Sequence, residues 1–302
     1  MERGAIDVES LAGGIDLQAT VESGQSYLWD REDGRMYERT AASGGSAWYW
    51  TTVRVDGDPE IVRVRQTDGR LRWEASFDAE QRLRTLLGLG DDLPAIRETA
   101  PGDAVVEEAY DDYWGMRIVR DPAFPTLISF ICSAQMRVSR IHGMQQAMRA
   151  EFGEEIRFDG ESYHAFPTPE ALAAATEAEL RELSLGYRAP YVKRSAELVA
   201  SGEADPETAR GLAYEEARDA LTEFVGVGDK VADCILLFSL GYLEAVPLDT
   251  WIRTTIEEFY PDCERGNYAD TSRAIRERLG GAYAGYTQTY LFHYLRSGGR
   301  DI

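Results

Sequence analysis

A short glycine-rich turn constrains this 302-residue chain more than any other stretch. The segment Phe224-Val-Gly-Val-Gly-Asp-Lys230 places Gly226 and Gly228 two residues apart, between two stretches whose apolar residues recur at helical spacing. Glycine permits backbone angles and close approaches that a Cβ would block. Residues 214–240 therefore predict a helix, a tight hairpin and a second helix, with Gly241 as its stop.

The hairpin also indicates where an anion would bind. A glycine turn that opens a helix presents free backbone N–H groups to an anion such as phosphate. Lys230 lies in the first turn of the second helix, where a cation opposes the helix dipole. That unfavourable placement favours a functional lysine over a solvated surface charge.

The charge composition strengthens the interpretation of Lys230. Asp and Glu number 53 against 32 Lys and Arg, which gives a net charge of −21, and Lys193 is the only other lysine. We expect such an acidic, lysine-poor chain to be adapted to high salt, as in a halophile. There the Debye length falls to about 3 Å near 1 M, so overall charge steers partners little. Where lysine is so scarce, a lysine at the mouth of a hairpin is less expected by chance.

Lys230 and Asp249 together predict covalent chemistry. A primary amine can attack an electrophilic sugar or carbonyl carbon and form an imine. A nearby carboxylate can stabilise a developing oxocarbenium ion or move protons. Asp249 stands at the predicted start of the next helix, where an N-cap contributes about 1 kcal/mol. We expect it to serve both purposes, because a cap holds its carboxylate in a fixed position.

The chain as a whole predicts an α+β fold. Residues 1–103 are rich in β-branched and aromatic residues, and the turns Asp56-Gly57 and Asp68-Gly69 indicate hairpins, so we expect an antiparallel sheet domain. Residues 104–302 predict a mainly helical domain that ends in an aromatic helix at about 283–297. Within it, helical spacing continues without a break over 126–152 and again over 170–183.

Several classes of protein are disfavoured by composition. The three cysteines, Cys132, Cys234 and Cys263, cannot supply four ligands to a structural zinc or an iron–sulfur cluster, so we expect no metal site and no cofactor. The chain contains no run of eighteen apolar residues, so the sequence predicts no membrane span. The first residues lack the features of a signal peptide. We expect a monomer in the cytoplasm, associated with the nucleoid, or in the nucleus if the source is eukaryotic.

Eight collinear segments carry a resemblance to a known family. They are Ser23-Gly-Gln-Ser26, Phe130-Ile-Cys-Ser133, Arg140-Ile-His-Gly-Met144, Tyr163-His-Ala-Phe-Pro167, Leu185-Gly-Tyr-Arg188, Gly226-Val-Gly-Asp-Lys-Val-Ala-Asp-Cys234, Ala245-Val-Pro-Leu-Asp249 and Gly285-Tyr-Thr-Gln-Thr-Tyr-Leu-Phe292. Over about residues 10–295 the chain resembles the 8-oxoguanine DNA glycosylase/AP lyases of the helix-hairpin-helix glycosylase superfamily. This implies an N-terminal antiparallel sheet domain and two helical subdomains, with double-stranded DNA across the cleft and the damaged nucleotide flipped into it.

The resemblance also implies a reaction and its residues. Lys230 attacks C1′, displaces the oxidised base and holds the sugar as a Schiff base, and β-elimination then nicks the strand. Asp249 stabilises charge at the sugar. The implied contacts to the base are the Gly24 carbonyl to N7–H, Cys234 and Phe292 on the two faces, Gln288 on the Watson–Crick edge, and Tyr290 near the pocket.

A rim of further contacts is implied in the same way. Arg140, Arg188 and Gln135 contact the opposite base, and Tyr187 wedges into the gap. The implied phosphate-binding residues are Gly226, Gly228, Val231 and Trp251, and a monovalent cation can bind the hairpin carbonyls. The chain departs from the family pattern at three positions: Gln135 replaces the usual Asn, Trp251 replaces a frequent His, and Tyr290 is bulkier than expected.

The sequence is also compatible with two other functions. A monofunctional glycosylase for alkylated or other damaged bases would need Asp249 but not Lys230. A non-catalytic helix-hairpin-helix DNA-binding protein would need neither residue. Adenine-excising and endonuclease III-like relatives are disfavoured, because most carry four clustered cysteines and this chain has three cysteines in all.

Overall fold

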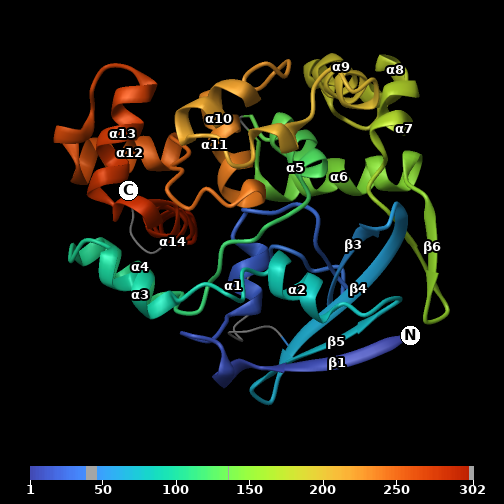
Figure 1. Ribbon diagram of the computed structural model, residues 1–302, viewed down its shortest axis with the longest axis horizontal. Helices are drawn as coiled ribbons and strands as arrows, with labels where there is room; N and C mark the ends of the chain where they lie inside the picture. Colours follow the sequence, from blue (N-terminus) through green and yellow to red (C-terminus); the bar gives the residue numbers. More distant parts are fainter. Residues whose placement is uncertain (39–45, 135, 299–302) are drawn as a thin grey trace.

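The first part of the chain forms an antiparallel sheet, as predicted. The computed structural model describes residues 1–38, 46–134 and 136–298. Five strands lie in the order β1-β5-β4-β3-β2 (Figure 1). Their bounds are β1 Glu2–Asp7, β2 Asp30–Arg31, β3 Tyr49–Val55, β4 Asp58–Thr67 and β5 Arg70–Ala75. The hairpins predicted at Asp56-Gly57 and Asp68-Gly69 are confirmed, and all four of these residues adopt positive φ angles.

Both faces of this sheet are covered. Residues of α1 and α2 pack on one face, where Leu17 and Leu83 are fully buried beside Trp29. On the other face Ile61 packs against Tyr163 in the hairpin of β6 and β7. The bounds of these elements are α1 Leu17–Glu22, α2 Glu80–Leu86, β6 Glu155–Phe158 and β7 Glu161–His164.

The remaining elements are helices, and in Figure 1 most of them lie above the sheet, whereas α3 and α4 lie to its left. They are α3 Leu93–Thr99, α4 Ala104–Asp112, α5 Ala123–Ile131, α6 Val138–Phe152, α7 Pro169–Ala174, α8 Glu177–Glu182, α9 Ala189–Ala200, α10 Tyr214–Leu221, α11 Asp229–Ile235, α12 Thr250–Phe259, α13 Tyr268–Arg278 and α14 Ala284–Arg296. Their shared core is centred on α5, which is buried along most of its length. This core also takes in Leu93 and Ile96, so packing crosses the domain boundary predicted at residue 103.

Two predicted helices are broken in the structure, so these predictions were wrong. The segment 126–152 is divided between α5 and α6, because the Ser133 hydroxyl donates to the Phe130 carbonyl at 2.8 Å and Arg137 turns to extended backbone. Such local side-chain bonds compete with helix continuation. The segment 170–183 is divided between α7 and α8, because Thr176 forms a capping box with Glu179 and starts a new helix.

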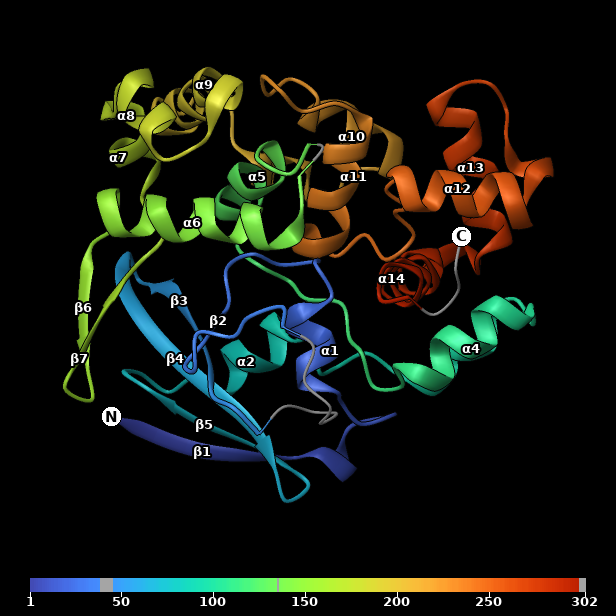
Figure 2. The same ribbon diagram turned by 180° about the vertical axis from the view of Figure 1, so that it is seen from behind.

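The hairpin region follows the prediction closely. α10 and α11 flank the glycine turn, and the second helix continues as a short π-helical segment, Leu236–Leu240, to Gly241. Gly241 has φ 82°, a left-handed conformation typical of a helix end. Figure 2 shows α14 between α12 and α13 on one side and α4 on the other. Within the described ranges, no helix is both long enough and apolar enough to span a bilayer.

Candidate active site

The glycine hairpin is held against a neighbouring helix. Gly226 has φ +87°, and a Cβ at this position would lie 2.8 Å from the ring of Tyr191 on α9. The backbone here therefore requires glycine. Gly228 has φ −100° and open space around it, and it serves as the N-cap of α11 without a side chain.

The N–H groups at the start of α11 differ in availability. An α-helix leaves its first-turn N–H groups without partners inside the helix, and these face the exposed hairpin. The Val231 N–H, however, donates to the Gly228 carbonyl at 2.9 Å. Val231 was expected to bind phosphate, but its N–H is already engaged, and its side chain lines the cavity described below.

Lys230 projects from the first turn of α11 toward α5. It is half-buried, and its Nζ donates to the Ser133 hydroxyl at 3.4 Å. Nζ also lies 5.6 Å from the ring centroid of Phe130, a cation–π contact. The amine is thus held by a neutral hydroxyl and an aromatic face.

Asp249 caps α12, as the sequence predicts. Its carboxylate accepts the Ile252 N–H at 2.9 Å. Burial raises the pKa of Asp249, whereas the backbone N–H groups and the charge of Lys230 act to lower it. Asp249 and Lys230 line the same cavity, so the structure brings the two predicted catalytic groups together.

This cavity has a volume of about 1190 Å³ and collects residues from distant parts of the chain. The predicted base contacts Gly24, Cys234, Gln288 and Phe292 all line it, together with Trp251. Cys234 lies one turn after Lys230 on α11, and burial raises its pKa to about 12, so it is a neutral thiol. Gln288 and Phe292 lie one turn apart on α14 and therefore share a face.

Tyr290 does not lie in this cavity, which corrects its predicted place beside the base. Its hydroxyl donates to the Met116 carbonyl at 2.8 Å, and its ring stacks on Tyr110 with 4.0 Å between centroids. The physical reason is helix geometry. Two residues after Gln288, a side chain points about 200° around the axis, into the core.

The described residues of the predicted rim lie in two elements, the turn before α9 and α6. Tyr187 is 57% exposed, in the short turn Gly186–Arg188 before α9. Arg188 is buried and donates to the Ala134 carbonyl, with its guanidinium 4.3 Å from the Tyr187 ring centroid. Arg140 is exposed on α6. Gln135 lies outside the described residues.

Three residues that sequence reasoning missed also line the cavity: Tyr27, Tyr37 and Arg296. Arg296 extends the spacing of Gln288 and Phe292 by one more turn, so helical periodicity could have found it. Tyr37 reaches the site through contacts of its loop, where its N–H donates to the Glu22 carboxylate at 2.9 Å. No local pattern in the sequence marks that contact.

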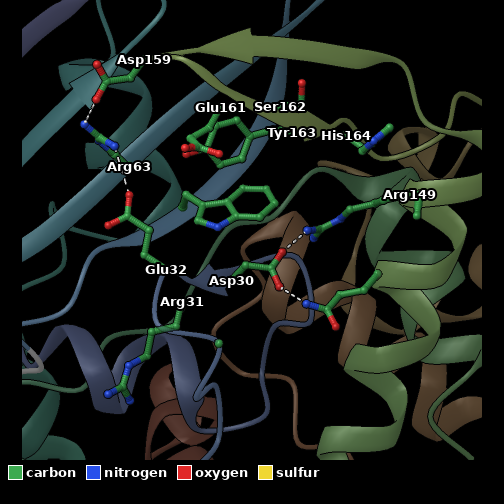
Figure 3. Close-up of a pocket in the computed structure, with 14 residues that line it drawn as sticks. Asp30, Arg31, Glu32, Arg63, Arg149, Asp159, Glu161, Ser162, Tyr163 and His164 are labelled. Atoms are coloured by element: carbon green, nitrogen blue, oxygen red, sulfur yellow. Dashed lines mark hydrogen bonds and ion pairs between the residues drawn. The ribbon is translucent and has the colours of Figure 1, made fainter.

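A second cavity, of about 760 Å³, lies between the sheet, α6 and the β6–β7 hairpin (Figure 3). Five of its charged groups are paired with one another. Arg149 bonds Asp30, and Arg63 bonds Glu32 at 3.0 Å and Asp159 at 2.6 Å. These pairs join the parts of the fold, whereas Lys230 and Asp249 lie in the other cavity.

A family model matches the part of the chain that holds the glycine hairpin and the two predicted catalytic residues. Residues 128–280, which include the hairpin, Lys230 and Asp249, match the HhH-GPD superfamily base excision DNA repair protein family. The chain belongs to this family. The resemblance seen in the sequence is thereby confirmed, and this HhH-GPD protein has the α+β fold that the sequence predicted.

Relatives of known description match over nearly the whole chain. A probable N-glycosylase/DNA lyase of Methanothermobacter thermautotrophicus is 32% identical over 95% of both chains. The N-glycosylase/DNA lyase of Saccharomyces cerevisiae is 31% identical over 91% of this chain and 82% of its own length. A structure of the Clostridium acetobutylicum 8-oxoguanine glycosylase/lyase, with double-stranded DNA containing cytosine opposite 8-oxoguanine, is 27% identical. Its TM-score is 0.80 over 95% of this chain and 93% of the other. This HhH-GPD protein is thus an enzyme of the N-glycosylase/DNA lyase class.

Proposed function

We propose that this enzyme removes 8-oxoguanine from double-stranded DNA and then nicks the strand by β-elimination. The observation that carries the proposal is one cavity that holds an amine, a carboxylate and the four residues expected to contact the base. Relatives described as N-glycosylase/DNA lyases and the fold shared with an 8-oxoguanine glycosylase/lyase support the lesion and the reaction.

The first step follows from the placement of Lys230. The damaged nucleotide flips into the cavity, and the neutral amine attacks C1′. The bond between C1′ and N9 breaks, and its electron pair leaves with the base. Asp249, fixed by its cap on α12, stabilises the positive charge that develops at the sugar.

The second step is the lyase reaction. The amine and the opened sugar form a Schiff base, which makes the C2′ proton acidic. Loss of this proton breaks the bond from C3′ to its oxygen, so the strand is nicked 3′ to the lesion. The same lysine thus performs both steps, which separates this proposal from a monofunctional glycosylase.

Recognition divides between the cavity and its rim. Cys234 and Phe292 stack on the base, Gln288 bonds its Watson–Crick edge, and the Gly24 carbonyl accepts from N7–H, which guanine lacks. The hairpin around Gly226 and Gly228 holds a phosphate through backbone N–H groups, which bind without regard to sequence.

At the rim, Tyr187 is exposed enough to wedge into the gap left by the flipped nucleotide. Arg140 and Arg188 contact the opposite base, and Trp251 contacts the backbone. Arg188 must first release the Ala134 carbonyl that it now bonds. A monovalent cation on the hairpin carbonyls remains part of the proposal and carries no step.

The test compares duplexes that differ at one base pair. We expect base release and strand nicking with 8-oxoguanine opposite cytosine, and neither with guanine in the same place. Running all four opposite bases then measures the preference of the rim. Release of an alkylated base without nicking, and no release of 8-oxoguanine, would contradict the proposal and favour the monofunctional alternative.

A further inference from the structure

Arg296 reaches the active-site cavity from the same helix as two of the proposed base contacts. Gln288, Phe292 and Arg296 are spaced four residues apart on α14 and lie on one face of it. All three line the cavity. Arg296 therefore stands at the end of a row whose other members are expected to bind the flipped base.

The guanidinium of Arg296 is held in a fixed orientation. Its Nη2 donates to the Glu22 carbonyl at 3.1 Å, and its centre lies 5.3 Å from the Phe292 ring centroid. Glu22 is the last residue of α1, and a cation at a helix C-terminus is favoured by the exposed carbonyls there. The Nη2 nitrogen is thus fixed by the Glu22 carbonyl, and Nη1 is the other nitrogen at the end of the guanidinium.

The other nitrogen of the fork has no partner. Nη1 of Arg296 is buried and makes no hydrogen bond among the described residues. It lies beside Gly24, where a Cβ would come within 2.6 Å of it. Burial lowers the pKa of Arg296, yet a guanidinium stays protonated in proteins. A buried charged donor without a partner costs free energy unless a ligand supplies the acceptor.

The Glu22 carboxylate already has hydrogen-bond donors other than Arg296. The side chain of Glu22 accepts from Arg31 at 3.1 Å and from the Tyr49 hydroxyl at 2.6 Å. The Asp249 carboxylate lines the same cavity but makes no hydrogen bond to Nη1. A bound molecule can supply the acceptor for Nη1, and an oxygen with partial negative charge suits it best.

We propose that Arg296 is a further catalytic residue, whose Nη1 donates to the C8 oxygen of the flipped base and stabilises the leaving base. This inference rests on the proposed function. C8 is bonded to N7, the atom whose hydrogen is read by the Gly24 carbonyl, and Nη1 lies against Gly24. The two contacts together would recognise both features that distinguish 8-oxoguanine from guanine.

The charge balance of the step explains why a cation helps. The Lys230 amine forms a bond to C1′, and the electron pair of the bond from C1′ to N9 departs on the base. The base then carries a negative charge that spreads from N9 through C8 to the oxygen, which Nη1 faces. The ammonium formed on Lys230 gives a proton to the departing base, which leaves as neutral 8-oxoguanine.

The test separates the two steps of the reaction. The variant Arg296→Met keeps a long unbranched side chain but removes the donor and the charge. In this variant we expect single-turnover release of 8-oxoguanine to fall by about 10²-fold. With a pre-formed abasic site no base departs, so strand nicking at such a site should fall by less than about twofold. Arg296→Lys should recover part of the excision rate, and millimolar guanidinium should rescue Arg296→Ala.

The control is Arg157→Met, at an exposed position on β6 that does not line the cavity, which should leave both steps at the wild-type rate. Equal loss of excision and of nicking at an abasic site would show a structural role and overturn the inference. Excision by Arg296→Met within twofold of the wild type would overturn it as well. If the wild-type enzyme itself releases no 8-oxoguanine, the proposed function is overturned. The wild-type reaction alone shows that outcome, so it is distinguishable from a failure of the inference on Arg296.

Discussion

The Asp249 carboxylate accepts the Ile252 N–H at 2.9 Å, so one side chain both starts α12 and lines the same cavity as Lys230. Asn caps helices about as well as Asp. We therefore expect Asp249→Asn to change the free energy of unfolding by less than about 0.5 kcal/mol and to slow excision by about 10²-fold. Asp92→Asn, at the cap of α3, is the matched control and should change neither quantity. Loss of stability in step with activity would reduce Asp249 to a cap.

The same residue predicts how the rate depends on pH. Burial is the largest influence on Asp249 and raises its pKa above the usual value for an aspartate. Its carboxylate must be ionised to stabilise a positive sugar, so the rate should fall on acidification through a pKa above the usual range of an aspartate. Single-turnover excision measured between about pH 4 and pH 7 checks this. A rate that stays level down to about pH 4 would contradict the charge role.

Substitutions at the two hairpin glycines should behave differently. Gly226→Ala places a Cβ 2.8 Å from Tyr191 at φ +87°, so we expect a loss of about 1–2 kcal/mol in stability and weaker binding to duplex DNA. Gly228→Ala meets no atom within 4 Å at a negative φ and should be tolerated. Thermal unfolding and DNA titration of both variants check the pair. Equal effects at the two positions would contradict the packing argument.

A buried carboxylate outside the active site predicts the pH dependence of stability. Asp121 is bonded to the Ser26 hydroxyl, and burial raises its pKa to about 7. Because the folded-state pKa is above the unfolded one, ionisation costs stability as pH rises through about 7. Asp121→Asn cannot ionise, so its stability relative to the wild type should rise by about 2 kcal/mol between about pH 5 and pH 8. Denaturant unfolding at both pH values tests this; an unchanged difference would contradict it.

The parts of the fold with local causes could be predicted from the sequence. The hairpin follows from Gly226 and Gly228, the helix stop from Gly241, and the start of α12 from Asp249. Each depends on a residue type and its immediate neighbours. The broken helix before α6 escaped prediction, because the Ser133 hydroxyl bonds the backbone of the preceding turn, and the apolar pattern gives no sign of it.

The site was predicted less completely, for two different reasons. Tyr290 was assigned to the pocket by resemblance along the chain, although helical geometry turns it about 200° from Gln288. The same helical geometry places Arg296 on the face of α14 that carries Gln288 and Phe292, although the sequence prediction did not include it. The contact between Tyr37 and Glu22 joins a loop to the end of α1, and only the folded chain brings these residues together.

The central claim is that Lys230 is the nucleophile, and borohydride trapping tests it most directly. Reduction of the Schiff base on a duplex with 8-oxoguanine opposite cytosine should join the wild-type protein to DNA covalently. Lys193→Gln is the matched control, because Lys193 is the only other lysine and its Nζ donates to the Ala173 and Ala175 carbonyls at the C-terminal end of α7. We predict a full yield of adduct with Lys193→Gln and none with Lys230→Gln. An adduct that survives in Lys230→Gln, or base release that continues in it at the wild-type rate, would contradict the account.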